Sequence, residues 1–302
     1  MIKIENVVLP SDEQWTRIIQ GTRNPKNSWD RSDSDYRRTL CDRCDNCLSY
    51  QLERWEDCDN CEVDTECKTH DGFMIGPNDH KLMMSLAAGG PVHAKYRRMI
   101  MVYLDITAPL YWWKEYDTYK IGTVANSCST MHKIHEKEFT LEDFSTEHLV
   151  DDGPLGDNKT KELEEAVKNC DDYSDACVKE DGYFCFDNET GYLAFAVPFN
   201  DTSINTFYYS PKSILKTFII PVLNANREAY LKTKDKKYWW QMIQLLPSSY
   251  NQKRTVLLNY EVLAGIYQSR KNHKLDEWHT FCDWIKTLPY SELITGEVGL
   301  QV

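Results

Sequence analysis

Long hydrophobic runs and an excess of basic residues are both missing from this sequence. No stretch approaches the roughly 18 consecutive apolar residues of a membrane-spanning helix, so we expect no membrane span. The first ten residues lack the basic start and apolar run of a signal peptide, which predicts a cytoplasmic protein. A net charge of −12 argues against a nucleic-acid partner, because phosphate backbones are bound by clustered Lys and Arg. A local basic pocket for one small phosphate remains compatible with that charge.

Internal repeats and a regular alternation of strands with helices are also missing. Helices and strands are instead intermixed, which is typical of an α+β fold. The 302 residues suffice for one domain with a sizeable core. We therefore expect a single domain over 1–302, with a mixed or antiparallel sheet and long helices. Two insertions are expected in it, a Cys-rich one over 41–70 and an acidic one with a hairpin over 145–210.

The expected elements follow from hydrophobic periodicity and from capping and turn residues. Alternating apolar residues predict a strand over 100–106, in which Asp105 makes the second face polar. Apolar runs on either side of 187–191 predict a β-hairpin. A further strand is expected before residue 12. Helices are expected over 12–20, 81–88, 110–119, 161–168, 213–231, 236–246, 254–270 and 275–288, with Asn78 and Asp79 capping the second.

Cysteine is concentrated in one short segment. Six of the 11 cysteines are Cys41, Cys44, Cys47, Cys58, Cys61 and Cys67. Thiolates three residues apart can hold one ion, and two such pairs complete a tetrahedral site. In a chain without a signal sequence, this clustering favours metal binding over disulfides. We predict a structural zinc site, formed by Cys58 and Cys61 with either Cys41 and Cys44 or Cys44 and Cys47. An iron–sulfur cluster and free surface thiols are the alternatives.

The predicted helix over 254–270 carries polar residues on its apolar side. Asn259 and Arg270 are 11 residues apart, so at about 100° per residue they point within about 20° of each other, about 16 Å apart along the axis. Such residues either satisfy structural hydrogen bonds or face a ligand. Residues 270–274 form the densest basic run of the chain. That run either complements the helix dipole or binds an anion.

Three stretches of the chain, taken in order, resemble the flavin-dependent thymidylate synthases. The first, 82–109, combines a helix, a Gly-Gly pair, His93, a strand and Ala108-Pro109. The second is the aromatic helix and loop over 111–131. The third starts at Leu246-Pro247 and contains Asn259 and Arg270 at the family's spacing. The resemblance covers most of the chain outside the Cys-rich segment and 145–210.

The resemblance implies an enzyme that methylates dUMP to dTMP. Methylenetetrahydrofolate would supply the carbon, NADPH would reduce a bound FAD, and the flavin would supply the hydride. Members of the family are homotetramers with active sites between subunits. Arg270 corresponds to the catalytic arginine that polarises the uracil carbonyl, where a fixed cation stabilises the developing enolate. The expected flavin contacts are His93, Asn126, Asn259 and His273. The expected substrate contacts are Lys120, Ser127, Ser129, Lys253 and Arg254.

The signature loop departs from the family pattern, which is Arg-His-Arg, seven residues, Ser, one residue and Arg. Those positions hold Thr118-Tyr119-Lys120 and Cys128-Ser129-Thr130, so only Lys120 keeps a charge. Lys95, Arg97 and Arg98 supply charge nearby in the sequence. Cys128 is expected to be a buried neutral thiol, with a uracil-attacking thiolate as the alternative. Two other functions therefore stay open: another flavin-dependent pyrimidine nucleotide one-carbon transferase, and a non-catalytic nucleotide- or partner-binding protein.

The purified chain is expected to contain about one zinc ion, because a short polar segment gains its fold from the metal. Elemental analysis checks the metal, and limited proteolysis after chelation checks that residues 41–70 unfold. Cys58→Ser should lose the metal, whereas Cys170→Ser, outside the cluster, should keep it. Metal-free protein would contradict the prediction.

Overall fold

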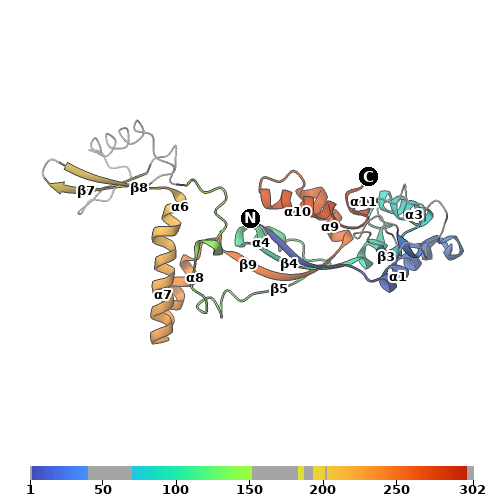
Figure 1. Cartoon of the computed structure of the whole chain (residues 1–302), viewed down its shortest axis with the longest axis horizontal. Coiled ribbons are helices and arrows are strands. Elements are labelled where there is room, and N and C mark those ends of the chain that lie inside the picture. The colour runs from blue at the N-terminus through green and yellow to red at the C-terminus, as the bar shows by residue number, and fades with distance from the viewer. Residues whose placement is uncertain (1, 40–69, 152–182, 187–192, 201–202, 298–302) are drawn as a thin grey trace, which may run out of the picture. The chain divides into compact units, whose positions relative to one another are not determined.

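The computed structural model describes residues 2–39, 70–151, 183–186, 193–200 and 203–297. The chain divides into two compact units. We call Ile2–Ile106, Glu115–Asn126 and Arg254–Val302 the terminal unit, and Thr107–Lys114 with Ser127–Lys253 the central unit. Helices and strands are intermixed along the chain, as expected for an α+β fold (Figure 1). Within the described ranges, no helix has both the length and the apolar character needed to cross a bilayer.

A four-stranded sheet, with the order β1-β4-β9-β5, organises the terminal unit. Its strands are β1 (Lys3–Val8), β4 (Met101–Pro109), β9 (Asn251–Asn259) and β5 (Val124–Ser127). The predicted alternation on β4 is confirmed, since Val102, Leu104 and Ile106 are buried between more exposed residues. Asp105, on the polar face, accepts hydrogen bonds from Asn6 Nδ2 at 2.9 Å and from Thr255 Oγ1 at 2.6 Å. Its carboxylate therefore ties together the three strands β1, β4 and β9.

The prediction of a helix over 254–270 is wrong for its first residues. Residues up to Asn259 belong to β9, where burial follows the two-residue period of a strand. Asn259 has extended backbone (φ −141°, ψ 169°), and its Oδ1 accepts from the N–H groups of Glu261 and Val262, both at 3.1 Å. It is thus the N-cap of α9 (Tyr260–Arg270). Asn259 therefore does not share a helical stripe with Arg270.

Helices from both ends of the chain complete the terminal unit. Helix α9 packs against α10 (Asp276–Lys286) and α11 (Glu292–Thr295), and buries Leu263 and Ile266. Near the N-terminus, a capping box between Ser11 and Gln14 begins α1 (Asp12–Arg23). Short 3-10 turns follow at η1 (Asn24–Lys26), η2 (Trp29–Arg31) and η5 (Lys95–Met99).

Helix α3 (Pro77–Ala88) begins earlier than expected. Gly76 is the N-cap, with Pro at the first helical position. The Asp33 carboxylate, from a distant segment, accepts from the N–H groups of Asn78 and Asp79 at 2.9 and 3.1 Å. The prediction that Asn78 and Asp79 cap the helix is therefore wrong, because another segment satisfies those N–H groups.

A two-stranded antiparallel ribbon brackets the Cys-rich segment. Its strands are β2 (Asp35–Thr39) and β3 (His70–Met74), paired from Asp35 with Met74 to Thr39 with His70. This register places Thr39 and His70, the residues that flank 40–69, opposite each other. The six cysteines between Cys41 and Cys67 lie outside the described residues, as does the helix expected over 161–168.

The central unit is built around a helical pair and its own core. The expected helices are confirmed as a continuous run of α6 (Pro211–Ile214), the π-helical turn η7 (Leu215–Ile219) and α7 (Ile220–Thr233), followed by α8 (Lys236–Leu245). Leu223, Met242, Phe139 and Phe144 form its buried cluster. The unit also contains α4 (Leu110–Tyr116), which begins in it, and η6 (Leu141–Asp143). The expected hairpin is present as β6 (Tyr183–Phe186) and β7 (Leu193–Asn200), and β8 (Ser203–Tyr209) adds an antiparallel strand that was not expected.

A buried ion pair joins α1 to α3. Arg23 Nε donates to Asp79 Oδ1 at 2.6 Å, and the Asp79 side chain is fully buried. Asp79 Oδ2 accepts from the hydroxyls of Ser32 and Ser34 at 2.7 Å, and from the N–H groups of Asp33 and Ser34 at 3.1 Å. Burial by itself would raise the pKa of Asp79, but hydrogen bonds from Ser34, Ser32 and Arg23 outweigh it and hold the pKa below its usual value.

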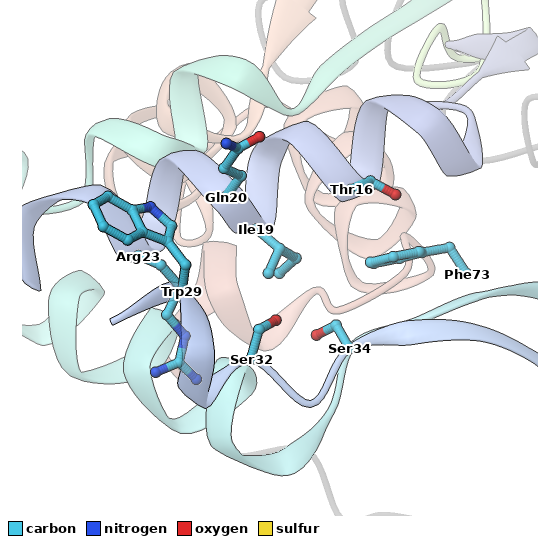
Figure 2. A pocket seen from close by; sticks show the side chains of 8 residues that line it. All are labelled: Thr16, Ile19, Gln20, Arg23, Trp29, Ser32, Ser34 and Phe73. Atoms are coloured by element: carbon cyan, nitrogen blue, oxygen red, sulfur yellow. The ribbon is translucent and has the colours of Figure 1, made fainter. Parts of the chain in front are cut away.

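A cavity of about 240 Å³ opens beside this ion pair. Figure 2 shows its lining side chains, which come from α1, η2, the 32–34 segment and β3. Ile19, Trp29 and Phe73 give it apolar walls, and Ser32 and Ser34 give it polar ones. Arg23, which also lines it, has a buried Nη2 without a hydrogen-bond partner among the described residues.

Asp79→Ala is expected to cost about 3–5 kcal/mol of unfolding free energy, because it leaves Arg23 buried without its counter-ion. The folded pKa of Asp79 is lowered, so its contribution is complete above the unfolded pKa of about 3.9 and is lost as pH falls through the folded value. The deficit of the variant should therefore be full at pH 7 and smaller at pH 3. Urea unfolding at the two pH values measures it. Asp283→Ala, which breaks an exposed pair with Lys286, should cost about 1 kcal/mol or less; equal losses would contradict this account.

Candidate functional site

The predicted site residues are divided between the two units. The terminal unit holds Arg270, His93, Asn126, Asn259, His273, Lys120 and Arg254. The central unit holds Ser127, Ser129 and Lys253.

Arg270 ends α9, and side chains of the terminal unit fix its guanidinium. Nη1 donates to Glu115 Oε2 at 2.6 Å, and Nε donates to the Tyr119 hydroxyl at 2.9 Å. The guanidinium carbon lies 4.8 Å from the ring centroid of Trp278, a cation–π distance. The side chain keeps 17% of its surface exposed. Arg270 is therefore held in one orientation while part of it still reaches solvent.

Glu115 is the centre of this arrangement. Its Oε2 accepts from Arg270 Nη1 and, at 3.2 Å, from Trp278 Nε1. The same oxygen lies 3.2 Å from His273 Nε2. The Leu275 N–H donates to His273 Nδ1 at 3.1 Å, so in the neutral ring Nδ1 is the acceptor and Nε2 carries the proton that faces Glu115. One carboxylate oxygen thus gathers three side chains, from α9, the following loop and α10. We call Glu115, Tyr119, Arg270, His273 and Trp278 the Arg270 cluster.

Three members of this cluster were not predicted from the sequence. Tyr119 stands at the histidine position of the degraded signature, and Trp278 belongs to α10. Glu115 is the acidic residue of the aromatic run at α4. The sequence did contain one indication that Glu115 has a role: it is the single acidic residue in an aromatic helix. A half-buried carboxylate needs hydrogen-bond or ion-pair partners. Neither Tyr119 nor Trp278 differs in the sequence from an ordinary core aromatic residue.

The predicted flavin contacts differ in the groups that they can offer. His93 and Asn126 are exposed. Asn259 is 6% exposed and its Oδ1 serves the helix cap, which leaves Nδ2 as the donor. His273 already faces Leu275 and Glu115 through its two nitrogens. His93, Asn126 and the Asn259 amide nitrogen therefore keep groups for a neutral ring edge, whereas both ring nitrogens of His273 are engaged.

The two least exposed cations near the signature are engaged in ion pairs. Arg254 Nη1 donates to Asp117 Oδ1 at 2.7 Å. Arg97 is buried and lies 3.6 Å from Glu261 Oε2. Lys95, Arg98 and Lys120 are exposed. The terminal unit therefore offers few fixed cations for the phosphates of a nucleotide.

The three predicted residues of the central unit lie around one loop. The Cys128 N–H donates to the Lys253 carbonyl at 2.9 Å, and Gln252 Nε2 donates to the Cys128 carbonyl at 2.9 Å. Ser129 Oγ accepts from the His132 N–H at 2.9 Å and so stabilises a turn. Cys128 is exposed, so the expectation of a buried thiol is wrong: its backbone, and not its side chain, is fastened to β9.

A second cavity, of about 470 Å³, opens next to His273. Lys271, His279, Cys282 and Lys286 contribute to its lining. Burial raises the pKa of Cys282 to about 11, so this thiol is neutral at physiological pH and is not a nucleophile. No group of three or more His, Cys, Asp or Glu side chains in the described part of the chain is arranged to hold a metal ion.

Comparison with known proteins finds similarity among solved structures. No protein-family model matches the sequence, and no curated protein matches it. The chain is similar to thymidylate synthase X (ThyX) from Helicobacter pylori, solved with FAD and dUMP, at 12% identity and a TM-score of 0.47 over 98% of this chain and 97% of that one. It is also similar to the UMP/dUMP methylase PolB from Streptomyces cacaoi, solved with 5-Br dUMP, at 12% identity and a TM-score of 0.46 over 98% and 94%. The first of these is of the family that the sequence motifs indicate, but values this low assign no function to the chain.

Glu115 and Arg270 are expected to be coupled in stability by about 1 kcal/mol, because their contact is half-buried and shared with Trp278. A double-mutant cycle with Glu115→Ala and Arg270→Ala, read by urea unfolding, measures the coupling. The exposed pair Lys133–Glu136 serves as a control and should give about 0–0.5 kcal/mol. Additive effects at Glu115 and Arg270 would show that the contact contributes nothing.

Proposed function

We propose that this chain is a flavin-dependent methyltransferase that converts dUMP to dTMP, with methylenetetrahydrofolate and NADPH as cosubstrates. The observation that carries the proposal is Arg270. The residue that the sequence resemblance assigns to the uracil carbonyl is also the residue whose guanidinium Glu115, Tyr119 and Trp278 hold in place.

A fixed arginine suits this chemistry for a physical reason. Negative charge develops on the uracil oxygen as carbon 5 becomes nucleophilic. A cation that is already oriented stabilises that charge without reorganising during the reaction. The bonds to Glu115 and Tyr119 hold Arg270, and they leave Nη2 without a partner among the described residues. Nη2 would therefore bind the carbonyl.

The flavin, when bound, would supply the hydride. His93, Asn126 and the Asn259 amide nitrogen would hold the edge of its ring system, because each can donate a hydrogen bond. Lys120, Ser127, Ser129, Lys253 and Arg254 would contact the nucleotide. Lys120 is a weaker phosphate ligand than the bidentate arginine of the family signature.

The Cys-rich segment would be a separate zinc-binding module. Cys41, Cys44, Cys47, Cys58, Cys61 and Cys67 are the proposed pool of ligands. Support comes from their spacing and from the β2–β3 ribbon, in which the flanking Thr39 and His70 are paired. Assembly into homotetramers and a cytoplasmic location are further predictions from the resemblance and the sequence.

A second candidate is a different pyrimidine nucleotide one-carbon transferase. The pairing of Arg97 with Glu261 and of Arg254 with Asp117 favours it, because a site with fewer available cations would hold its nucleotide differently. A non-catalytic nucleotide-binding protein would also fit the loss of the signature cations.

Protein purified under anaerobic conditions is expected to contain FAD, whose absorption spectrum shifts when dUMP is added. Product analysis with dUMP and dCMP then separates the two transferase candidates. Absence of flavin, even after FAD is added, would favour the binding protein.

Arg270→Ala should abolish turnover, and its far-UV circular dichroism should match that of wild type. Removal of one preorganised charge-stabilising group typically costs about 10²–10³-fold in kcat. Lys274→Ala, in the exposed basic turn, is the matched control and should keep activity. Wild-type activity in Arg270→Ala would refute the site.

A further inference from the structure

The Glu115–Arg270 pair has unused hydrogen-bonding groups on both partners. Glu115 Oε2 is occupied by Arg270 and Trp278 and faces His273, whereas Oε1 accepts no hydrogen bond within the described residues. Arg270 uses Nε and one N–H of Nη1, and Nη2 has no partner in the same part of the chain. Glu115 is 34% exposed and Arg270 is 17% exposed, so a ligand can reach both.

The charge of this pair decides which part of a nucleotide fits. Glu115 neutralises Arg270 at 2.6 Å, and His273 is oriented with its N–H toward the same carboxylate. A phosphate placed here would meet the Glu115 carboxylate, and like charges at such distances repel. The pair is therefore poorly suited to an anion and well suited to a neutral polar group.

A donor beside an acceptor matches a particular chemical edge. The imide edge of uracil presents a carbonyl oxygen next to the N3–H group. A carbonyl can accept from Arg270, and N3–H can donate to Glu115 Oε1, which accepts no hydrogen bond within the described residues. Hydrogen bonds in which one partner is ionised are the stronger class.

We propose that Glu115 is a specificity residue that accepts the N3–H of a uracil base whose carbonyl binds Arg270, and that its charge directs the phosphate away from Arg270. This inference rests on the proposed function, since it names the atoms by which the same site would recognise its substrate. The sequence had indicated neither Glu115 nor the N3–H group of the base as part of the recognition.

The test compares uridine with 3-methyluridine, in which a methyl group replaces the hydrogen of N3. Both are titrated into the full chain, with FAD added, and followed by ligand-observed NMR. Uridine is expected to bind at least about tenfold more tightly, because the methylated base leaves the Glu115 oxygen unpaired. Inorganic phosphate should not compete with uridine on the wild-type protein. Equal binding of the two nucleosides, no binding of uridine, or competition by phosphate would overturn the proposal.

Two variants separate recognition from folding. In Glu115→Ala the ratio between the two nucleosides should fall to within about twofold. In Glu115→Gln, which keeps the size of the side chain and removes its charge, phosphate should begin to compete with uridine. Glu292→Gln, which alters a comparable pair with His80, should behave as wild type. An unchanged ratio in Glu115→Ala would overturn the assignment of Glu115.

The readouts for this inference and for the enzyme are independent. Flavin content and dTMP formation report on the proposed function, whereas the nucleoside ratio reports on Glu115. Protein without flavin or turnover that still prefers uridine would refute the enzyme and support the recognition. Active flavoprotein that binds both nucleosides equally would support the enzyme and refute the recognition by Glu115.

Discussion

The buried contact between Arg23 and Asp79 is the constraint on which the N-terminal half of the terminal unit depends. A fully buried carboxylate that stays charged is tolerable only if it is paired with a cation and hydrogen-bonded. Asp79 meets that condition with donors from α1 and the 32–34 segment, while it is itself part of α3. Because Ser34 directly precedes β2, the same carboxylate also fixes where the ribbon starts. One charged group therefore holds α1, the 32–34 segment and α3 together.

The Arg270 cluster applies the same physics to a half-exposed position. Glu115 there also collects several donors on one carboxylate, but one of its oxygens stays open to solvent-side ligands. The two carboxylates differ in burial, and this difference determines their roles. Asp79 is fully buried and is structural, whereas Glu115 is 34% exposed and keeps capacity for a ligand. Both acids neutralise an arginine.

Much of the architecture was predictable, because it follows from local periodicity. The strand around Asp105 and the helices of the central unit were expected at nearly their observed bounds. The failures were at positions set by distant partners. Asn259 was placed inside a helix, although β9 pairs with β4 and makes it a cap, and Asp33 caps α3 from another segment. The family spacing pointed to Arg270, whose role stays a prediction. The contacts of Glu115 could not be predicted, since its three neighbours are separated from it by more than 150 residues.

The in-register pairing of β2 with β3 has a consequence for how this chain could have acquired its cysteines. Thr39 and His70 are directly opposite each other, so the described chain stops and resumes at one paired position on either side of the intervening 30 residues. A tight turn of two residues can join paired strands at such a point, and lengthening a loop costs little closure entropy. A short turn could therefore replace the segment without changing the pairing of β2 with β3. A gene could gain or lose it in one step, while the sheet, the buried ion pair and the Arg270 cluster kept their contacts.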